Sequence, residues 1–118
     1  MTKAADDETL VEEVNEVRLV GRLSGAPQQR VLPSGDELWT FRVVVPRPPT
    51  DRRQPVDALE CVAWNARIRR SVARWTDGDL VEVSGSVRRR FYRAGGATVS
   101  RVEVEATRGR VIRRAASA

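Results

Sequence analysis

A single helix candidate, residues 65–75, stands between β-rich segments on both sides, and this order limits the fold more than any other feature of the chain. Asp77, Gly78 and Asp79 end that helix. The predicted strands are one that begins at Val17 and others over residues 28–32, 37–45, 57–64, 80–92 and 97–106. A short helix between the third and fourth long strands of a small all-β chain is the arrangement of the OB-fold, a five-stranded Greek-key barrel. An SH3-like barrel, which also has short strands and long loops, is the alternative on pattern alone.

Length and charge distribution predict one domain with two short ends. At 118 residues the chain is long enough for one domain and too short for two ordinary ones. Residues 1–16 carry a local charge of −5, whereas residues 88–118 carry +7. We expect an acidic N-terminal arm over residues 1–14, an OB-fold domain over residues 15–112 and a short basic tail over residues 113–118.

The residue types that the chain lacks exclude several classes of protein. With no His and one Cys, it cannot build a Ser-His-Asp or Cys-His triad, a zinc, haem or iron–sulfur site, or an internal disulfide. A Gly-rich phosphate loop of the GxxxxGKS type is also missing. We therefore expect that the protein is not an enzyme and that it binds no cofactor, metal or small-molecule substrate. The lone Cys61, with no apolar run of membrane length and no secretory signal, predicts a cytoplasmic protein that does not bind membranes.

Arginine supplies 20 of the 21 basic side chains. Its planar guanidinium can bond two phosphate oxygens and can lie flat on a ring, which lysine cannot do. A GC-rich coding sequence would also favour Arg over Lys, but it does not explain why nine arginines gather in residues 88–118.

Alternation along residues 80–92 separates a core side from a wet side. The core side holds Val81, Val83, Gly85 and Val87. The wet side holds Ser84, Ser86, Arg88, Arg90 and Tyr92. Two arginines alone indicate a solvated face, but Tyr92 in register with both favours a binding surface. Phe91 falls on the core side, and we expect it to close the barrel end.

The other large rings divide between the core and the surface. Trp75 has core spacing on the helix candidate and is expected inside. Trp39 and Phe41 share the apolar side of their strand and are expected in the core, whereas Arg42 lies on the opposite side. Alternation leaves Trp64 open, as a core residue or as an exposed ring.

One face of the sheet and the loop beside it form the candidate surface. The loop, residues 46–55, holds four prolines, which no helix or sheet ladder tolerates. The candidate binding residues are Arg42, Arg47, Arg52, Arg53, Trp64, Arg88, Arg90 and Tyr92. Rings suit unpaired bases, because every base has a π face, and arginines neutralise phosphates. A duplex hides its base faces, so the pattern indicates a protein that binds single strands.

These segments resemble bacterial single-stranded DNA-binding proteins. Residues 15–23, Asn-Glu-Val-Arg-Leu-Val-Gly-Arg-Leu, resemble the opening strand of that family, Asn-x-Val-x-Leu-(Val/Ile)-Gly-x-Leu. Residues 60–64, Glu-Cys-Val-Ala-Trp, resemble its third strand, and residues 78–92 contain its Gly-x-x-Val-x-Val-x-Gly-x-(Leu/Val)-Arg-x-Arg pattern. The similarity covers about residues 15–112, and the Arg content resembles that of actinobacterial members.

The resemblance implies binding of single-stranded DNA without strong sequence preference, in replication, recombination or repair. It implies that Trp64 and Tyr92 stack on bases and that Arg88 and Arg90 contact DNA. Two further stacking positions of the family fall on Ala58 and in the proline-rich loop, where this chain has no ring. Because family members form dimers and tetramers, we expect a homo-oligomer, most simply a tetramer.

The basic C-terminal end differs from the acidic tip of typical family members, and in this the chain resembles a tailless paralogue. We therefore expect no protein partners that bind through such a tail. Two alternatives remain at this stage. One is a primosome-type accessory protein that helps load a helicase. The other is an OB-fold protein-interaction subunit whose arginine face meets an acidic partner and needs no rings.

Overall fold

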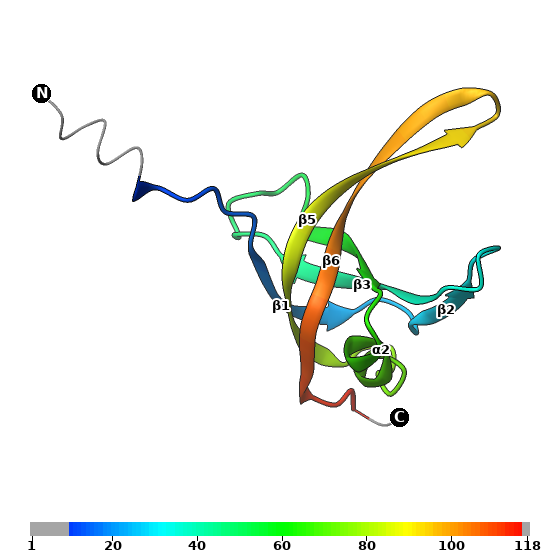
Figure 1. The fold of residues 1–118 in the computed structure, drawn as a ribbon. Coiled ribbons are helices and arrows are strands. Elements are labelled where there is room, and N and C mark those ends of the chain that lie inside the picture. The colour runs from blue at the N-terminus through cyan, green and yellow to red at the C-terminus, as the bar shows by residue number, and fades with distance from the viewer. Residues whose placement is uncertain (1–9, 117–118) are drawn as a thin grey trace, which may run out of the picture.

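The structure is a computed structural model that describes residues 10–116, and it contains six strands and helix α2 (Figure 1). The elements are β1 (Val17–Leu23), β2 (Gln28–Val31), β3 (Glu37–Pro46), β4 (Val56–Ala63), α2 (Ala66–Val72), β5 (Leu80–Ala94) and β6 (Ala97–Arg113). Their order is the predicted one, but α2 is shorter than expected and β6 is longer. Within the described range, no helix is long and apolar enough to span a membrane.

Five of the strands close into a barrel. The sheet order is β1-β5-β6-β4-β3-β2, and β1 also pairs with β3 through Arg22↔Val44 and Leu23↔Val43. β2 pairs only with β3 and projects from the barrel as part of a hairpin (Figure 1). Helix α2 follows the third barrel strand and precedes the fourth, so the predicted all-β OB-fold is confirmed.

The core fills the barrel and the space beneath α2. The Asn65 side chain accepts a hydrogen bond from the Ile68 amide at 2.9 Å, which fixes where α2 begins. Trp75 and Phe41 are both buried, as predicted, and their rings meet edge to face with centroids 5.4 Å apart. Trp39 is partly buried against the same cluster. Gly109 leaves room for the Trp75 ring, because a Cβ there would lie 2.7 Å from it.

Strands β5 and β6 continue beyond the barrel as a two-stranded ribbon. Strand β1 pairs with β5 only as far as Gly85, and β4 pairs with β6 only over residues 61–63, so the rest of the ribbon has no third strand. Solvent therefore reaches both faces. Two expectations were wrong for this reason: Phe91 is 68% exposed and Val87 is 43% exposed. Alternation assigned their side of the strand but gave no information on where the barrel ends.

A bulge marks the point where the ribbon leaves the barrel. The register between β5 and β6 shifts between Ser84 and Gly85. At Gly85 a Cβ would lie 1.9 Å from the Glu105 carbonyl oxygen, so no side chain fits there without moving the backbone. Glycine at this position permits the close approach of the two strands.

A buried carboxylate ties the end of the helical segment to the chain after β6. Asp79 is fully buried, and its carboxylate accepts hydrogen bonds from the Thr76 amide at 2.9 Å and the Ala115 amide at 2.8 Å. Arg114 also donates to it at 3.0 Å. Burial alone would raise the pKa of Asp79, but these hydrogen bonds together hold that pKa below its ordinary value.

We expect Asp79→Ala to lower the free energy of unfolding by about 1–3 kcal/mol, because buried amides lose their acceptor. The folded-state pKa of Asp79 is depressed, so its contribution is present above the unfolded-state pKa and is lost as the pH falls through the folded-state pKa. Urea denaturation should therefore show a difference at neutral pH that shrinks in acid. The control Glu13→Ala, at an exposed acid, should change the stability by less than about 0.5 kcal/mol. Equal urea midpoints for Asp79→Ala and the unaltered chain at neutral pH would contradict this role.

Candidate nucleic-acid interface

The outer face of the sheet brings Trp64 and the β5 arginines together. Trp64 follows the last residue of β4 and is partly buried, and the Arg90 guanidinium carbon lies 5.5 Å from its ring centroid. The ring that alternation left open therefore stands on the outer side, under a guanidinium. Such a cation–π contact contributes about 0.5–1 kcal/mol at an exposed site.

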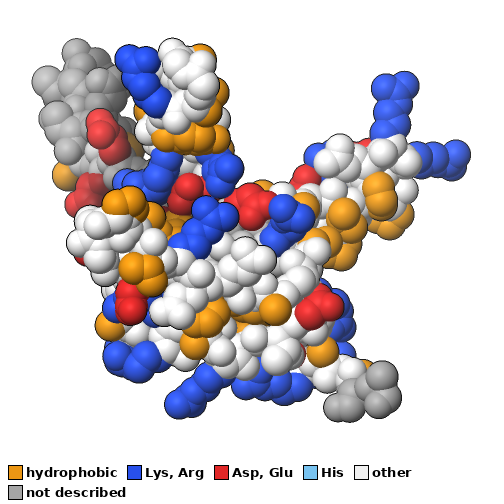
Figure 2. Space-filling model, turned by 90° about the vertical axis from the view of Figure 1, so that its right-hand side faces the viewer, with side chains coloured by type: hydrophobic (Ala, Val, Ile, Leu, Met, Phe, Trp, Pro, Cys, Tyr) orange, Lys and Arg blue, Asp and Glu red, His pale blue; other side chains and the backbone are white. Residues whose placement is uncertain are grey.

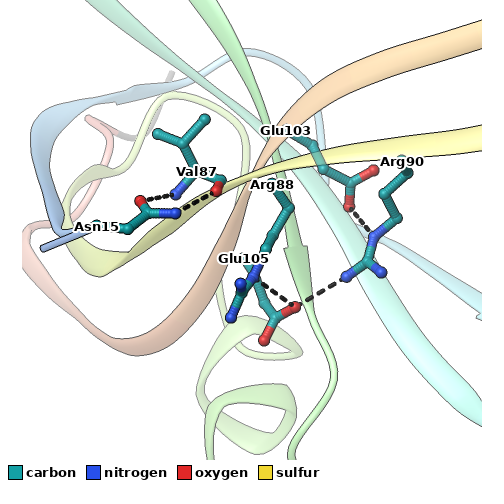
Figure 3. Close-up of polar contacts among 6 residues, drawn as sticks. All are labelled: Asn15, Val87, Arg88, Arg90, Glu103 and Glu105. Carbon is teal, nitrogen blue, oxygen red and sulfur yellow. Dashed lines mark hydrogen bonds and ion pairs between the residues drawn. The ribbon is translucent and has the colours of Figure 1, made fainter. Parts of the chain in front are cut away.

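Two glutamates of β6 hold the arginines of β5 on that face (Figure 3). Arg90 donates to Glu105 at 2.8 Å and to Glu103 at 3.4 Å, and Arg88 lies 3.7 Å from the same Glu105 oxygen. Both arginines therefore point to one side of the ribbon, as alternation predicted. The side chains of Glu103 and Glu105 are only 13% and 27% exposed, whereas those of the arginines are about half exposed.

The segment before β1 fixes the start of the ribbon. The Asn15 side chain accepts a hydrogen bond from the Val87 amide at 2.9 Å and donates one to the Val87 carbonyl at 2.7 Å (Figure 3). These two bonds replace a neighbouring strand at the position next to Arg88. The first residue of the family-like motif at residues 15–23 thus has a structural role beside the interface.

A second ring and guanidinium lie farther along the same face. Tyr92 is 45% exposed, and the Arg101 guanidinium carbon lies 5.8 Å from its ring centroid. The register pairs Arg90 with Arg101 and Tyr92 with Val99, which places Arg101 on the Tyr92 side of the ribbon. Two ring–guanidinium pairs, Trp64–Arg90 and Tyr92–Arg101, therefore follow one another along the outer face.

Arg42 extends this face onto β3. It pairs across the sheet with Glu60 on β4, and its Nε donates to that carboxylate at 2.7 Å. Figure 2 shows the molecule from the right-hand side of Figure 1, where basic and acidic side chains lie next to one another in a hollow between two projecting parts. The candidate face is therefore a mixed surface in which carboxylates accompany the arginines.

The arginines of the proline-rich loop divide into two kinds. Arg47 donates to Asp57 at 2.8 Å and to Asp51 at 2.7 Å, and these hydrogen bonds raise its pKa above the ordinary value. It thus closes the loop onto β4. Arg52 and Arg53 are exposed and make no ion pair with any residue from 10 to 116.

Sequence reasoning missed four polar residues of this surface: Glu60, Arg101, Glu103 and Glu105. Alternation assigns each residue to a side of its own strand, but it does not state which residue of the next strand lies opposite. The bulge at Gly85 shifts that register further. No signal in the chain marked these residues as neighbours of the arginines.

Comparison with known proteins agrees with this architecture. The model of the Single-strand binding protein family matches residues 14–112. Single-stranded DNA-binding protein 3 of Listeria innocua is 35% identical over 81 residues, which cover 67% of this chain and 51% of the relative. Single-stranded DNA-binding protein of Oceanobacillus iheyensis is 32% identical over 96 residues, which cover 79% of this chain and 60% of the relative.

The fold also matches a solved structure, that of the Plasmodium falciparum SSB complex with ssDNA. The TM-score is 0.70 at 22% identity, and the match covers 87% of this chain and 96% of the other. The chain spans only about half to three-fifths of the length of its curated bacterial relatives. The family match nevertheless covers most of the chain, and the chain therefore belongs to the Single-strand binding protein family.

Proposed function

We propose that this chain binds single-stranded DNA without strong sequence preference, by stacking bases on rings and neutralising phosphates with arginines. The observation that carries the proposal is the pair of ring–guanidinium contacts, Trp64–Arg90 and Tyr92–Arg101, on one exposed face. The bacterial relatives are named single-stranded DNA-binding proteins, which supports the same ligand. Unpaired bases expose the flat surfaces that such rings accept, whereas a duplex does not.

Binding exchanges the partners of the arginines. In the free protein Arg88 and Arg90 contact Glu105, and Arg42 contacts Glu60. The arginine ends of these pairs are about half exposed, and ion pairs that solvent reaches contribute only about 0–1 kcal/mol, so a phosphate can replace a carboxylate at small cost. A base then occupies the space over each ring. We assign Trp64 and Tyr92 to stacking, and Arg42, Arg88 and Arg90 to phosphates.

The proline-rich loop extends the interface. Arg52 and Arg53 are exposed and available for phosphates, and Arg47 holds the loop closed while it carries positive charge beside them. The protein acts stoichiometrically and without chemistry, and it covers single strands during replication, recombination or repair in the cytoplasm.

Titration of a fluorescently labelled oligo-dT, followed by anisotropy, tests the proposal. We expect Trp64→Ala and Tyr92→Ala each to weaken binding by about 1–3 kcal/mol, the contribution of one stacked base. Tyr92→Phe keeps the ring and should bind almost as the unaltered chain does. Raising the salt concentration should weaken binding steeply, because phosphate contacts release counterions. Equal affinity for duplex and single strands, with no loss in either alanine variant, would refute the proposal and favour a protein partner.

The carboxylates on the face should oppose DNA. Glu105→Gln removes a negative charge beside Arg88 and Arg90, so we expect binding of oligo-dT to become about two- to fivefold tighter at low salt, in line with the strength of exposed ion pairs. Glu12→Gln removes the same charge from the exposed segment before β1 and serves as the matched control. Weaker binding by Glu105→Gln than by this control would show that the carboxylate positions the arginines rather than competes with DNA.

We further propose that the chain forms a homo-oligomer, a tetramer in the simplest case. Strand β1 pairs with β3 only at Arg22 and Leu23, so most of that edge is unpaired, and Val11 and Val14 before it are exposed. An open strand edge next to apolar side chains favours pairing with another chain. Light scattering should give a molar mass near four times 13.2 kDa. A mass of a single chain at all concentrations would refute the oligomer and leave the DNA proposal intact.

A further inference from the structure

The ribbon that β5 and β6 form beyond the barrel has a second face, which the proposed interface does not use (Figure 1). We call it the Phe91 face, and the face that carries Arg90 and Tyr92 is the Tyr92 face. The same side of β5 holds the buried Val81 and Val83 inside the barrel, so the Phe91 face continues the core side of the sheet. Register and alternation assign to it Val87, Arg89, Phe91 and Arg93 of β5, and Thr98, Ser100 and Val102 of β6.

The ring of Phe91 is exposed and uncovered. At 68%, Phe91 is the most exposed aromatic residue in the described part of the chain. A guanidinium lies over the ring of Trp64 and another over that of Tyr92, but none from residues 10–116 lies over Phe91. Its partner across the ribbon is Ser100, which is too small to cover a ring. A flat and uncovered ring is the surface on which an unpaired base stacks.

Two arginines flank this ring on the same face. Arg89 precedes Phe91 by two residues and donates to the Ser100 hydroxyl at 3.0 Å, which holds its guanidinium beside the position opposite the ring. Arg93 follows Phe91 by two residues and donates to the Gly96 carbonyl at 3.3 Å. Both arginines are exposed. The phosphates on either side of a base stacked on Phe91 can therefore each meet a guanidinium.

The Phe91 face carries no carboxylate. Within the ribbon, residues 87–104, the one acidic residue is Glu103, which bonds Arg90 on the Tyr92 face. The arginines of the Tyr92 face must leave a carboxylate before they bind phosphate, whereas Arg89 and Arg93 have none to leave. With two arginines and no acid, the Phe91 face has a charge of +2. A polyanion meets attraction there and no nearby repulsion.

The end of the ribbon leaves room for a strand to pass from one face to the other. Only small residues lie there, namely Ala94, Gly95, Gly96 and Ala97. A Cβ added to Gly95 or Gly96 would have no neighbour within 4 Å outside the adjoining residues. Phe91 and Tyr92 are adjacent in sequence but lie on opposite faces, so one base cannot stack on both rings. A strand bound on the Tyr92 face reaches Phe91 only if it is long enough to turn around the ribbon.

We propose that Phe91, flanked by Arg89 and Arg93, is a third stacking site for single-stranded DNA. The site rests on the proposed function, because it takes a base of a strand that already occupies the Trp64–Tyr92 interface. It lengthens the bound segment without reading its sequence, since every base has a π face. A second copy of the chain is a poorer occupant, because a twofold contact would bring the same arginines of two copies together.

The test compares strand lengths in Phe91→Leu, which keeps an exposed apolar side chain but removes the flat ring. Anisotropy is measured with labelled oligo-dT of about 10 nucleotides and of roughly 30, since one OB-fold covers about 4–16. We expect Phe91→Leu to bind the short strand within about twofold of the unaltered chain. It should bind the long strand at least about fivefold more weakly, the loss of one stacked base. Phe91→Tyr keeps the ring and should bind both strands as the unaltered chain does.

The flanking arginines are tested by the salt dependence of binding. Arg89→Ser/Arg93→Ser removes both cations of the Phe91 face. The matched control, Arg30→Ser/Arg74→Ser, removes two exposed arginines outside the ribbon. For the long strand, the slope of log affinity against log salt should be smaller by about 1.4 in the first variant than in the control, or about 0.7 for each lost phosphate contact. Equal slopes in the two variants would contradict phosphate contacts on this face.

The outcomes separate the third stacking site from the function on which it rests. Equal long-strand affinity of Phe91→Leu and the unaltered chain would overturn the site, while binding of oligo-dT by the unaltered chain would keep the proposed function. A lower molar mass of Phe91→Leu in light scattering, with unchanged DNA binding, would assign the face to a contact between copies and also overturn the site. Failure of the unaltered chain to bind either strand would refute both proposals.

Discussion

The antiparallel pairing of β5 with β6 is the interaction on which the rest of the structure depends. These are the two longest strands, and they pair from Leu80↔Arg113 to Ala94↔Ala97. Within the barrel the pair buries Val81, Val83, Val104 and Ala106, and beyond the barrel it presents Arg90 and Tyr92 to solvent. One strand pair therefore supplies both part of the core and the candidate interface. The buried part of the pair ends at the bulge at Gly85 and the solvent-exposed part begins there. At this point the register shifts and β1 no longer pairs with β5.

Carboxylates on the interface have a double effect on the proposed binding. Glu105 holds Arg88 and Arg90 on one side of the ribbon, so the guanidinium of Arg90 is already placed over Trp64 before a ligand arrives. A side chain that is positioned in advance loses less conformational freedom on binding. The same carboxylate repels the phosphate that would replace it. Because the arginines of these pairs are about half exposed, the ion pairs are weak, and replacing the carboxylate by a phosphate costs little free energy.

Chain order and alternation were enough to predict the barrel, the place of the helix and the side of β5 that carries Arg88, Arg90 and Tyr92. They failed where the answer depended on a neighbouring strand. Phe91 has the correct side for a core residue, but no strand covers that side beyond the barrel, and it stands 68% exposed. The partners Glu103 and Glu105 escaped prediction because cross-strand register is a property of the folded sheet.

The distribution of rings and arginines determines how such a protein would select single strands. Ala58 and the proline-rich loop lack the rings that the family resemblance implies, so the proposed function leaves base stacking to Trp64 and Tyr92. Arginines contribute affinity but little selectivity, because a duplex carries phosphates too. In the proposed function, affinity comes mainly from the charge of the interface arginines, whereas the choice of single over double strands depends on the two rings. In the proposed function, selectivity therefore depends on Trp64 and Tyr92, and affinity depends on the arginines around them.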